Sequence, residues 1–297
     1  MSAPGKRGST FPLRLDDLSA RGTAARTTVA PVATPGPVTA PKLRATAAAA
    51  RSVLRPQRLV EHAHVDASRH VAPSGLGMDS ADVRSRMAQR LRGAGVSSAA
   101  VLTAMAHVPR HLFVDAALVT QAYEDTSLPI GHGQTISKPS VVARMLELLL
   151  GGATARQSGA LGRVLEIGTG CGYQAAVLAR LATHVVSVER LRPLHDKARN
   201  LLAPLRPTNL RLVYGDGMRG HPPNAPYDSI IAAAGGDELP SAWLDQLAPG
   251  GRLVSPVRQA GSDRQVLMVV DRTEHGYERS VFEAVHFVPL KSGLVAG

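Results

Sequence analysis

The chain has 297 residues, of which 44% are apolar, so it can bury a core in one large domain or two small ones. It contains no run of about 18 apolar residues, no continuous apolar segment near its start and one cysteine, Cys171. We therefore expect no membrane span, no secretory signal, no internal disulfide and no cysteine-based metal cluster. Of the net charge of +11, residues 1–78 carry +7, from 11 basic and 4 acidic residues. The rest of the chain has 23 basic and 19 acidic residues and shows no large basic patch in its sequence. We therefore expect no nucleic-acid partner.

Residues 1–78 are rich in Ala, Pro, Thr and Arg and lack sustained apolar periodicity, so we expect a largely disordered basic extension. A short Ala-rich helix around residues 46–54 is compatible with this composition. The extension is Arg-rich and acid-poor like a transit peptide, but its prolines weaken that resemblance. A solvated tail without a specific partner is the alternative to a targeting or interaction role.

The folded domain is expected over residues 79–297, with helices at its start. The first helix is predicted from apolar residues at helical spacing, Val83, Met87 and Leu91. Ser98 is placed to cap a second helix that ends near Ala106. Pro109 breaks the pattern and leads to a further short helical segment.

Residues 126–138 are polar and contain glycines, which predicts a loop. Pro139 suits the first turn of the helix that follows, because its missing N–H would have no partner there. The core stripe of that helix is Val142, Met145, Leu146 and Leu149. Residues 151–162 are expected to form another loop.

From Arg163 onward, strand and helix patterns alternate, which predicts a Rossmann-like, doubly wound α/β fold with a mostly parallel sheet. Strands are expected at 163–167, 184–189, 210–214, 228–232 and 251–255. Helices are expected at 172–182, 192–203 and 240–247. The last two strands, Val266–Asp271 and Ser280–Val288, follow each other closely and predict a C-terminal antiparallel hairpin.

A glycine-rich loop follows the first of these strands. The short apolar run that ends at Ile167 indicates a buried parallel strand, and Gly168, Gly170 and Gly172 follow it directly. Such a loop lies where open α/β sheets bind ligands, at the carboxyl end of a strand. Tyr173 stands where the dinucleotide fingerprint G-x-G-x-x-G has its third glycine. The pattern is instead E-x-G-x-G-x-G, starting at Glu166, which resembles motif I of S-adenosylmethionine-dependent methyltransferases.

Two further acids end strands of the predicted sheet. Glu189 ends the second strand and is placed to accept both hydroxyls of a ribose; the alternative is a surface acid paired with Arg190 or Arg192. Asp216 lies between two glycines at the end of the third strand. It can reach an adenine amino group, although Gly-Asp-Gly is also an ordinary turn sequence.

For the other residues with reactive side chains, structural roles are weighed against catalytic or metal-binding ones. Ser137 is either functional or the N-cap of the following helix, and no G-x-S-x-G elbow indicates a hydrolytic nucleophile. Cys171 is interpreted as a small side chain beside a cofactor rather than a reactive thiol. His107 and His111 stand four residues apart, but Pro109 between them disrupts a helix, so no metal site is expected.

Taken together, these motifs resemble the protein-L-isoaspartate O-methyltransferase family over residues 82–291. The segment G-H-G-Q-T-I-S-K-P at 131–139 is similar to the family's G-x-G-Q-T-I-S-x-P, and L-E-I-G-T-G-C-G-Y at 165–173 matches its motif I with cysteine in place of serine. S-V-E-R at 187–190 and later blocks at 215–217 and 283–290 also match. The fourth strand departs from the pattern: it ends in Ala232-Ala233-Ala234, where the family usually has Thr-Ala-Ala.

The resemblance implies an enzyme that methylates the α-carboxyl of L-isoaspartyl residues in damaged proteins, with S-adenosylmethionine as the cofactor, after which a succinimide forms spontaneously. Ser137 would be the active-site serine that orients this carboxylate. The implied cofactor contacts are Ile136, Glu166, Gly168, Gly170, Gly172, Glu189, Asp216 and Gly217. The implied substrate contacts are Gln134, Thr135, Val257 and Gln265, the last two through strand edges. Residues 79–150 would help to cover the substrate and cofactor, and a cytoplasmic monomer is expected.

Two other functions stay open at this stage. The three alanines at 232–234 allow a cofactor-binding protein that has lost turnover or has altered substrate activity. A nucleotide-dependent oxidoreductase is the other alternative, and Tyr173 in place of the third glycine argues against it.

Overall fold

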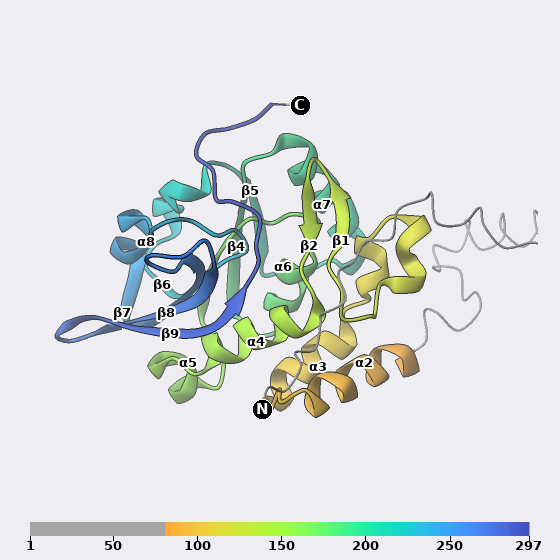
Figure 1. Cartoon of the computed structure of the whole chain (residues 1–297), viewed down its shortest axis with the longest axis horizontal. Coiled ribbons are helices and arrows are strands. Elements are labelled where there is room, and N and C mark those ends of the chain that lie inside the picture. The colour runs from red at the N-terminus through yellow and green to blue at the C-terminus, as the bar shows by residue number, and fades with distance from the viewer. Residues whose placement is uncertain (1–80, 297) are drawn as a thin grey trace, which may run out of the picture. The chain divides into compact units, whose positions relative to one another are not determined.

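The computed structural model describes residues 81–296 (Figure 1). The expectations for residues 1–78, including the short helix at 46–54, lie outside this part of the chain. Within it, no helix has both the length and the apolar character needed to cross a bilayer.

One seven-stranded sheet forms the centre of the described domain, in the order β5-β4-β3-β6-β7-β8-β9. Its parallel strands are β3 (Arg163–Ile167), β4 (His184–Glu189), β5 (Leu210–Tyr214), β6 (Tyr227–Ala232) and β7 (Leu247–Arg258). The antiparallel strands are β8 (Gln265–Thr273) and β9 (Gly276–Val285). The predicted doubly wound sheet with a C-terminal hairpin is confirmed. Because β3 pairs with both β4 and β6, the strand order reverses beside it, which is where such sheets bind ligands.

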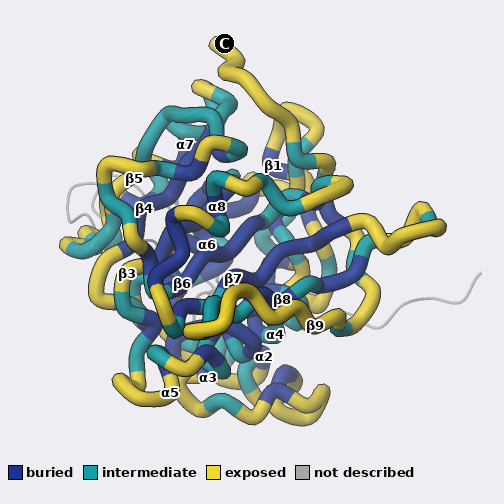
Figure 2. The backbone as a smooth tube through the Cα atoms, turned by 90° about the vertical axis from the view of Figure 1, so that its left-hand side faces the viewer, coloured by how far each residue is buried: buried dark blue, intermediate teal, exposed yellow. Residues whose placement is uncertain are grey.

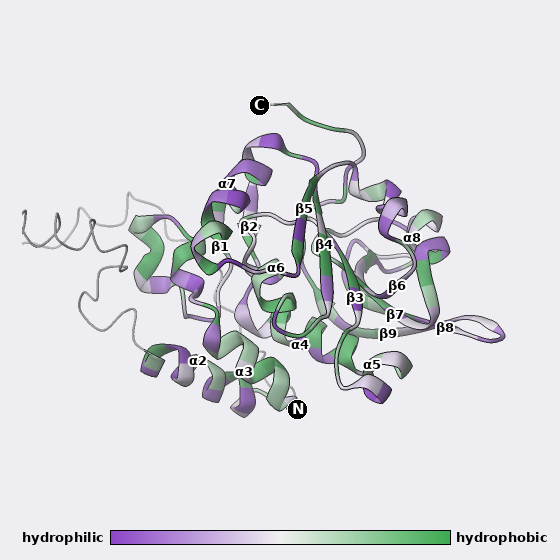
Figure 3. Ribbon diagram, turned by 180° about the vertical axis from the view of Figure 1, so that it is seen from behind, coloured by the Kyte–Doolittle hydropathy of each residue, from purple (hydrophilic) through white to green (hydrophobic). Residues whose placement is uncertain are grey.

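The helices of the described domain are α2 (Ala81–Gly93), α3 (Ala99–His107), α4 (Pro139–Leu150), α5 (Ala153–Ser158), α6 (Tyr173–Leu178), α7 (Arg192–Leu202) and α8 (Ser241–Gln246). Short 3-10 turns connect them: η2 (Arg110–Phe113), η3 (Ala116–Gln121), η4 (Ala203–Leu205), η5 (Gly217–Arg219) and η6 (Pro222–Asn224). Figure 3 shows both hydrophilic and hydrophobic residues along α7. Its buried residues, Leu194, Ala198 and Leu202, recur every four positions, so one stripe of the helix faces the core.

Successive residues of each strand contribute side chains to two separate apolar cores, because neighbouring side chains of a strand point to opposite faces of the sheet. Val164 and Ile231 belong to the larger core, which also takes residues from α2, α3, α4, α6 and α7. Leu165 and Ile230 belong to the smaller core on the other face, with Trp243 of α8. Figure 2 shows the central strands as buried and much of β9 as exposed.

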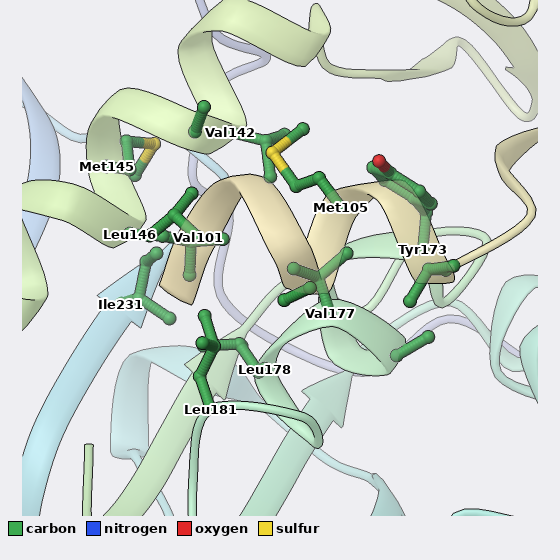
Figure 4. Packing of buried hydrophobic residues seen from close by; sticks show 14 of the residues in the cluster. Val101, Met105, Val142, Met145, Leu146, Tyr173, Val177, Leu178, Leu181 and Ile231 are labelled. Carbon is green, nitrogen blue, oxygen red and sulfur yellow. The ribbon is translucent and has the colours of Figure 1, made fainter. Parts of the chain in front are cut away.

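Helix α3 contributes one buried face to the larger core. Its Val101 and Met105 contact residues of α4 and α6, such as Leu146 and Val177 (Figure 4). As predicted, Ser98 is the N-cap of α3, and its Oγ accepts a hydrogen bond from the Val101 N–H.

Two predicted loops contain regular structure instead. Residues 126–138 hold a hairpin of β1 (Leu128–Gly131) and β2 (Gln134–Ile136), whose turn has positive φ at His132 (53°) and Gly133 (67°). Two positive φ angles match the twist of a short hairpin. Residues 151–162 contain the short helix α5, and α6 ends at Leu178 rather than at the expected residue 182.

The last described residues, 286–296, form a segment that we call the C-terminal strap. It forms isolated bridges with loops at the carboxyl ends of the parallel strands, Pro289 with Gly235 and Val295 with Leu191. The prediction extended the last strand to Val288, but β9 ends at Val285 and the chain turns into the strap.

Candidate active site

A cavity of about 860 Å³, part of it open to solvent, lies at the carboxyl ends of the parallel strands. Its lining comes from the β1–β2 hairpin and the residue after it, from the loops after β3, β4, β5 and β6, and from the C-terminal strap. The predicted site residues that line it are Gln134, Thr135, Ile136, Ser137, Gly168, Gly170, Glu189 and Gly217.

The glycine loop after β3 has a left-handed backbone at each of its three glycines. Gly168 (φ 89°) and Gly170 (φ 57°) line the cavity. Gly172 (φ 93°) does not; a Cβ there would lie 2.9 Å from Leu202 Cδ1. Its lack of a side chain therefore serves the packing of α6 against α7, which the spacing of the motif alone does not reveal.

Glu189 is almost fully buried at the wall of the cavity. Its Oε2 accepts a hydrogen bond from the Gly170 N–H and its Oε1 accepts one from the Leu191 N–H, both at 2.9 Å. The carboxylate thereby ties the glycine loop to the end of β4 and keeps further lone pairs for a ligand. The alternative of a surface ion pair is wrong, because Arg190 donates to the Gly293 carbonyl and Arg192 pairs with Asp196.

Glu166 lies fully buried in β3, outside the cavity lining. Its Oε2 accepts a hydrogen bond from Ser187 Oγ on the neighbouring strand, and that hydroxyl lies 2.6 Å from Thr169 Oγ1 of the glycine loop. Burial raises the pKa of the Glu166 carboxyl to about 8, the Ser187 hydrogen bond opposes this shift, and the charge of Glu189 adds to it. The residue supports the loop from within the sheet.

Asp216 uses both carboxylate oxygens on backbone groups. Oδ1 accepts from the Met218 N–H at 3.0 Å and Oδ2 from the Gly293 N–H of the strap at 2.8 Å. Asp216 is thus the N-cap of η5, as the turn interpretation expected, and it does not line the cavity. Its neighbour Gly217 does, and the Trp243 indole N–H donates to the Gly217 carbonyl at 2.8 Å.

Ser137 lines the cavity on the side of the hairpin. The N-cap of α4 is Lys138, so the capping role considered for Ser137 is wrong. Asp125 binds the start of α4 instead, because its Oδ1 and Oδ2 accept from the Ser140 N–H and hydroxyl at 2.8 and 2.7 Å. Among the described residues, the Ser137 hydroxyl has no hydrogen-bond partner, so it can act on a ligand.

The C-terminal strap contributes cavity residues that the sequence did not indicate: Val288, Leu290 and Lys291. The strap is held by the Gly235 N–H, which donates to the Val288 carbonyl, and by Arg190, whose Nε donates to the Gly293 carbonyl, both at 2.9 Å. Pro289 was the available signal, because proline donates no ladder hydrogen bond and often ends a strand.

Val257 and Gln265 do not line the cavity. The expectation that they offer a free strand edge is wrong, because β7 and β8 are both paired on their two sides. Gln265 Oε1 accepts from the Phe287 N–H at 2.7 Å, and Val257 bridges Gly236. Both residues support the loops around the cavity from behind.

Cys171 lines the cavity but is buried, and burial raises the pKa of its thiol to about 11. The thiol is therefore protonated at neutral pH, which disfavours a nucleophilic role. His107 Nδ1 contacts the Thr103 carbonyl and His111 Nδ1 contacts the Tyr123 hydroxyl. Within residues 81–296, no group of three or more His, Cys, Asp or Glu side chains is arranged to hold a metal ion.

Comparison with known proteins agrees with this geometry. Residues 82–294 match the family model described as protein-L-isoaspartate(D-aspartate) O-methyltransferase. A protein-L-isoaspartate O-methyltransferase of Methylibium petroleiphilum is 57% identical over 294 residues, 99% of each chain. One of Leptothrix cholodnii is 61% identical over 241 residues, 80% of this chain and 84% of the relative.

Solved structures show the same fold. A protein-L-isoaspartate O-methyltransferase superposes with a TM-score of 0.63 at 31% identity, covering 71% of this chain and 67% of the other. A Plasmodium falciparum protein in complex with S-adenosyl-L-homocysteine superposes with a TM-score of 0.59 at 23% identity, covering 70% and 98%. The motifs, the sheet and these matches show that the chain belongs to the protein-L-isoaspartate(D-aspartate) O-methyltransferase family.

Proposed function

We propose that this chain transfers a methyl group from S-adenosylmethionine to the α-carboxyl of L-isoaspartyl residues in damaged proteins and peptides. The observation that carries the proposal is one cavity whose lining contains Ser137 together with Gly168, Gly170 and Glu189. Within residues 81–296 the Ser137 hydroxyl has no hydrogen-bond partner, so it is available to a ligand. The names of relatives at 57% and 61% identity support the same activity and disfavour a binding protein without turnover.

The cavity residues fit this cofactor. Side chains on Gly168 and Gly170 would be strained at their positive φ, so the backbone there stays open to a ligand. The Glu189 carboxylate is acceptor-only and suits hydroxyl groups, and it brings negative charge to the wall that would bind a cationic sulfonium. When bound, S-adenosylmethionine supplies an electrophilic methyl group. Glu166 and Asp216 would support this site through the glycine loop and the strap.

The acceptor needs little chemical activation from the protein. A carboxyl group with a pKa of about 4 is already ionised at neutral pH, so no general base is required. The chain has to hold the carboxylate in line with the methyl group and keep water away. Ser137 would donate a hydrogen bond that orients the carboxylate, and Gln134, Thr135 and Ile136 would shape the wall around it. Ala233 and Ala234 line the same cavity and leave room for the substrate.

Methyl transfer to a matched pair of peptides tests the proposal. The wild-type chain should methylate an isoaspartyl peptide and not the corresponding aspartyl peptide. Ser137→Ala should lower kcat by about tenfold or more, because an orienting hydrogen bond is lost, while calorimetry with S-adenosyl-L-homocysteine should give a nearly unchanged Kd. Ser140→Ala is the control, because its hydroxyl binds Asp125 outside the cavity.

Two results would contradict the proposal. Equal activity on both peptides, or activity on neither, would remove the substrate assignment. Binding of the cofactor product without any turnover would favour the cofactor-binding alternative instead. Full activity of Ser137→Ala would remove only the role of the serine.

We further propose that the enzyme acts as a monomer in the cytoplasm and without nucleic acid. The single, buried cysteine fits a reducing compartment. The basic excess lies mostly in residues 1–78, and the rest of the chain carries only +4. Sedimentation of the purified chain at several concentrations checks the oligomeric state.

A further inference from the structure

Arg110 is a fully buried arginine close to the active-site hairpin, and nothing in the motifs indicated a role for it. Its side chain has 0% exposure. Buried arginines are rare unless they are paired, yet within residues 81–296 no carboxylate lies within ion-pair distance of Arg110. Burial lowers the pKa of Arg110, although an arginine side chain remains charged in a protein. The described part of the fold therefore buries this cation without a carboxylate partner.

The guanidinium is bound by backbone carbonyls on both sides of the hairpin. Nε donates to the Ala122 carbonyl at 2.8 Å, before β1. Nη2 donates to the Ser137 carbonyl at 2.7 Å, after β2, and makes a longer contact of 3.5 Å with the Thr126 carbonyl. One planar group thus joins the segments that enter and leave the hairpin. A lysine ammonium cannot reproduce this fixed fork of donors.

The Arg110 side chain also contacts the side of the cavity that is formed by the glycine loop and the start of α6. The guanidinium carbon lies 4.7 Å from the ring centroid of Tyr173, the residue that follows the glycine loop. Tyr173 lines the cavity, and its other contacts include an edge-on stack with Phe113 at 5.7 Å between centroids. Arg110 is therefore in contact both with the backbone of the serine and with the end of the glycine loop.

We propose that Arg110 is a positioning residue for methyl transfer, which fixes the backbone of Ser137 relative to the glycine loop. The proposal rests on the function proposed above for Ser137. Loss of the fork would let the hairpin shift while leaving Gly168, Gly170 and Glu189 in place. The rate of the chemical step should therefore suffer more than cofactor binding.

The first test compares Arg110→Lys with Arg252→Lys. Arg252 is also a largely buried arginine, and it donates to the Leu148 carbonyl at 2.8 Å and to Asp271, away from the cavity. Arg110→Lys should lower kcat for the isoaspartyl peptide by about tenfold to 100-fold, since small misplacements of reacting groups cost this much. The Kd of S-adenosyl-L-homocysteine should stay within about threefold, because direct cofactor contacts remain. Arg252→Lys should lose stability but keep kcat.

A double-mutant cycle with Ser137→Ala separates positioning from general structural damage. If Arg110 acts through Ser137, Arg110→Lys should lower kcat by less than about twofold in the Ser137→Ala background, because coupled residues are not additive. Arg110→Met is the second variant. It keeps much of the side-chain volume and removes the buried charge, so it can fold even where the buried site does not accommodate a lysine ammonium.

The outcomes are distinguishable. Additive losses, or a kcat that Arg110→Lys and Arg110→Met leave unchanged, would overturn the positioning role. An equal loss of kcat in Arg252→Lys would assign the effect to stability and overturn it as well. Full activity of Ser137→Ala would instead contradict the proposed role of the serine itself.

Discussion

Acids at the ends of neighbouring strands have different environments, and these decide what each carboxylate does. Glu189 ends β4 and Asp216 lies just after β5, and the sequence suggested that both bind a ligand, but only Glu189 lines the cavity. Asp216 Oδ2 is bound by the Gly293 N–H, 77 residues away in the sequence. A local pattern can predict where an acid lies on a sheet, but it cannot predict a partner from a distant loop.

Glu166 should make the stability of the protein depend on pH. The pKa of its carboxyl is about 8 in the folded protein, against an ordinary value of 4.5. Between pH 4.5 and pH 8 the unfolded chain has therefore released a proton that the folded protein keeps. The free energy of unfolding therefore falls as pH rises from 4.5 to 8, and this contribution is constant outside that window. Glu166→Gln does not titrate, so urea denaturation should show the variant gaining stability relative to wild type across the window. A difference between the two proteins that does not change with pH would contradict this.

At the scale of elements, the strands were predicted well because their apolar runs are short and bounded by turn residues. β3, β4 and β5 have the predicted limits. The β1–β2 hairpin was missed because its polar, glycine-rich sequence looks like a loop. Only three of its residues, Leu128, Ile130 and Ile136, show the buried face. Ser137 directly follows this hairpin, so the motif was recognised while the structure that presents it was not.

Gly172 and Gly95 form a matched pair for testing what the third loop glycine does. Both have positive φ, 93° at Gly172 and 104° at Gly95. A Cβ added at position 172 would contact Leu202 and Ala198, whereas a Cβ added at position 95 would have no atom within 4 Å. Alanine at either position should cost about 1–2 kcal/mol through backbone strain. Gly172→Ala should lose more stability than Gly95→Ala because of the added contact with α7. Urea denaturation of both variants measures the difference, and equal losses would show that α7 adapts without cost.

At the scale of the whole molecule, the described residues that line the cavity all lie between positions 130 and 291. The family model matches residues 82–294. The motifs alone indicated a resemblance to this family over residues 82–291. They did not indicate that the β1–β2 hairpin and the C-terminal strap meet at the cavity, because these two segments come together only through the tertiary fold.

Removing residues 1–78 should leave catalysis intact. A variant that starts at residue 79 keeps every cavity residue and both apolar cores of the described domain, while its formal charge falls from +11 to +4. We expect the same kcat and KM on a neutral isoaspartyl peptide as for the full chain. A large rise in KM, measured at moderate salt, would show that the extension takes part in substrate binding.

The C-terminal strap makes the order of synthesis relevant to activity. Val288, Leu290 and Lys291 belong to the cavity wall, yet they follow every strand of the sheet in the sequence, so a ribosome adds them after the sheet is complete. Since domains form progressively as a chain emerges, the sheet can assemble before this wall exists. A nascent or prematurely terminated chain that stops before the strap would then have its glycine loop without a closed site, so cofactor retention would mark chains that include the strap.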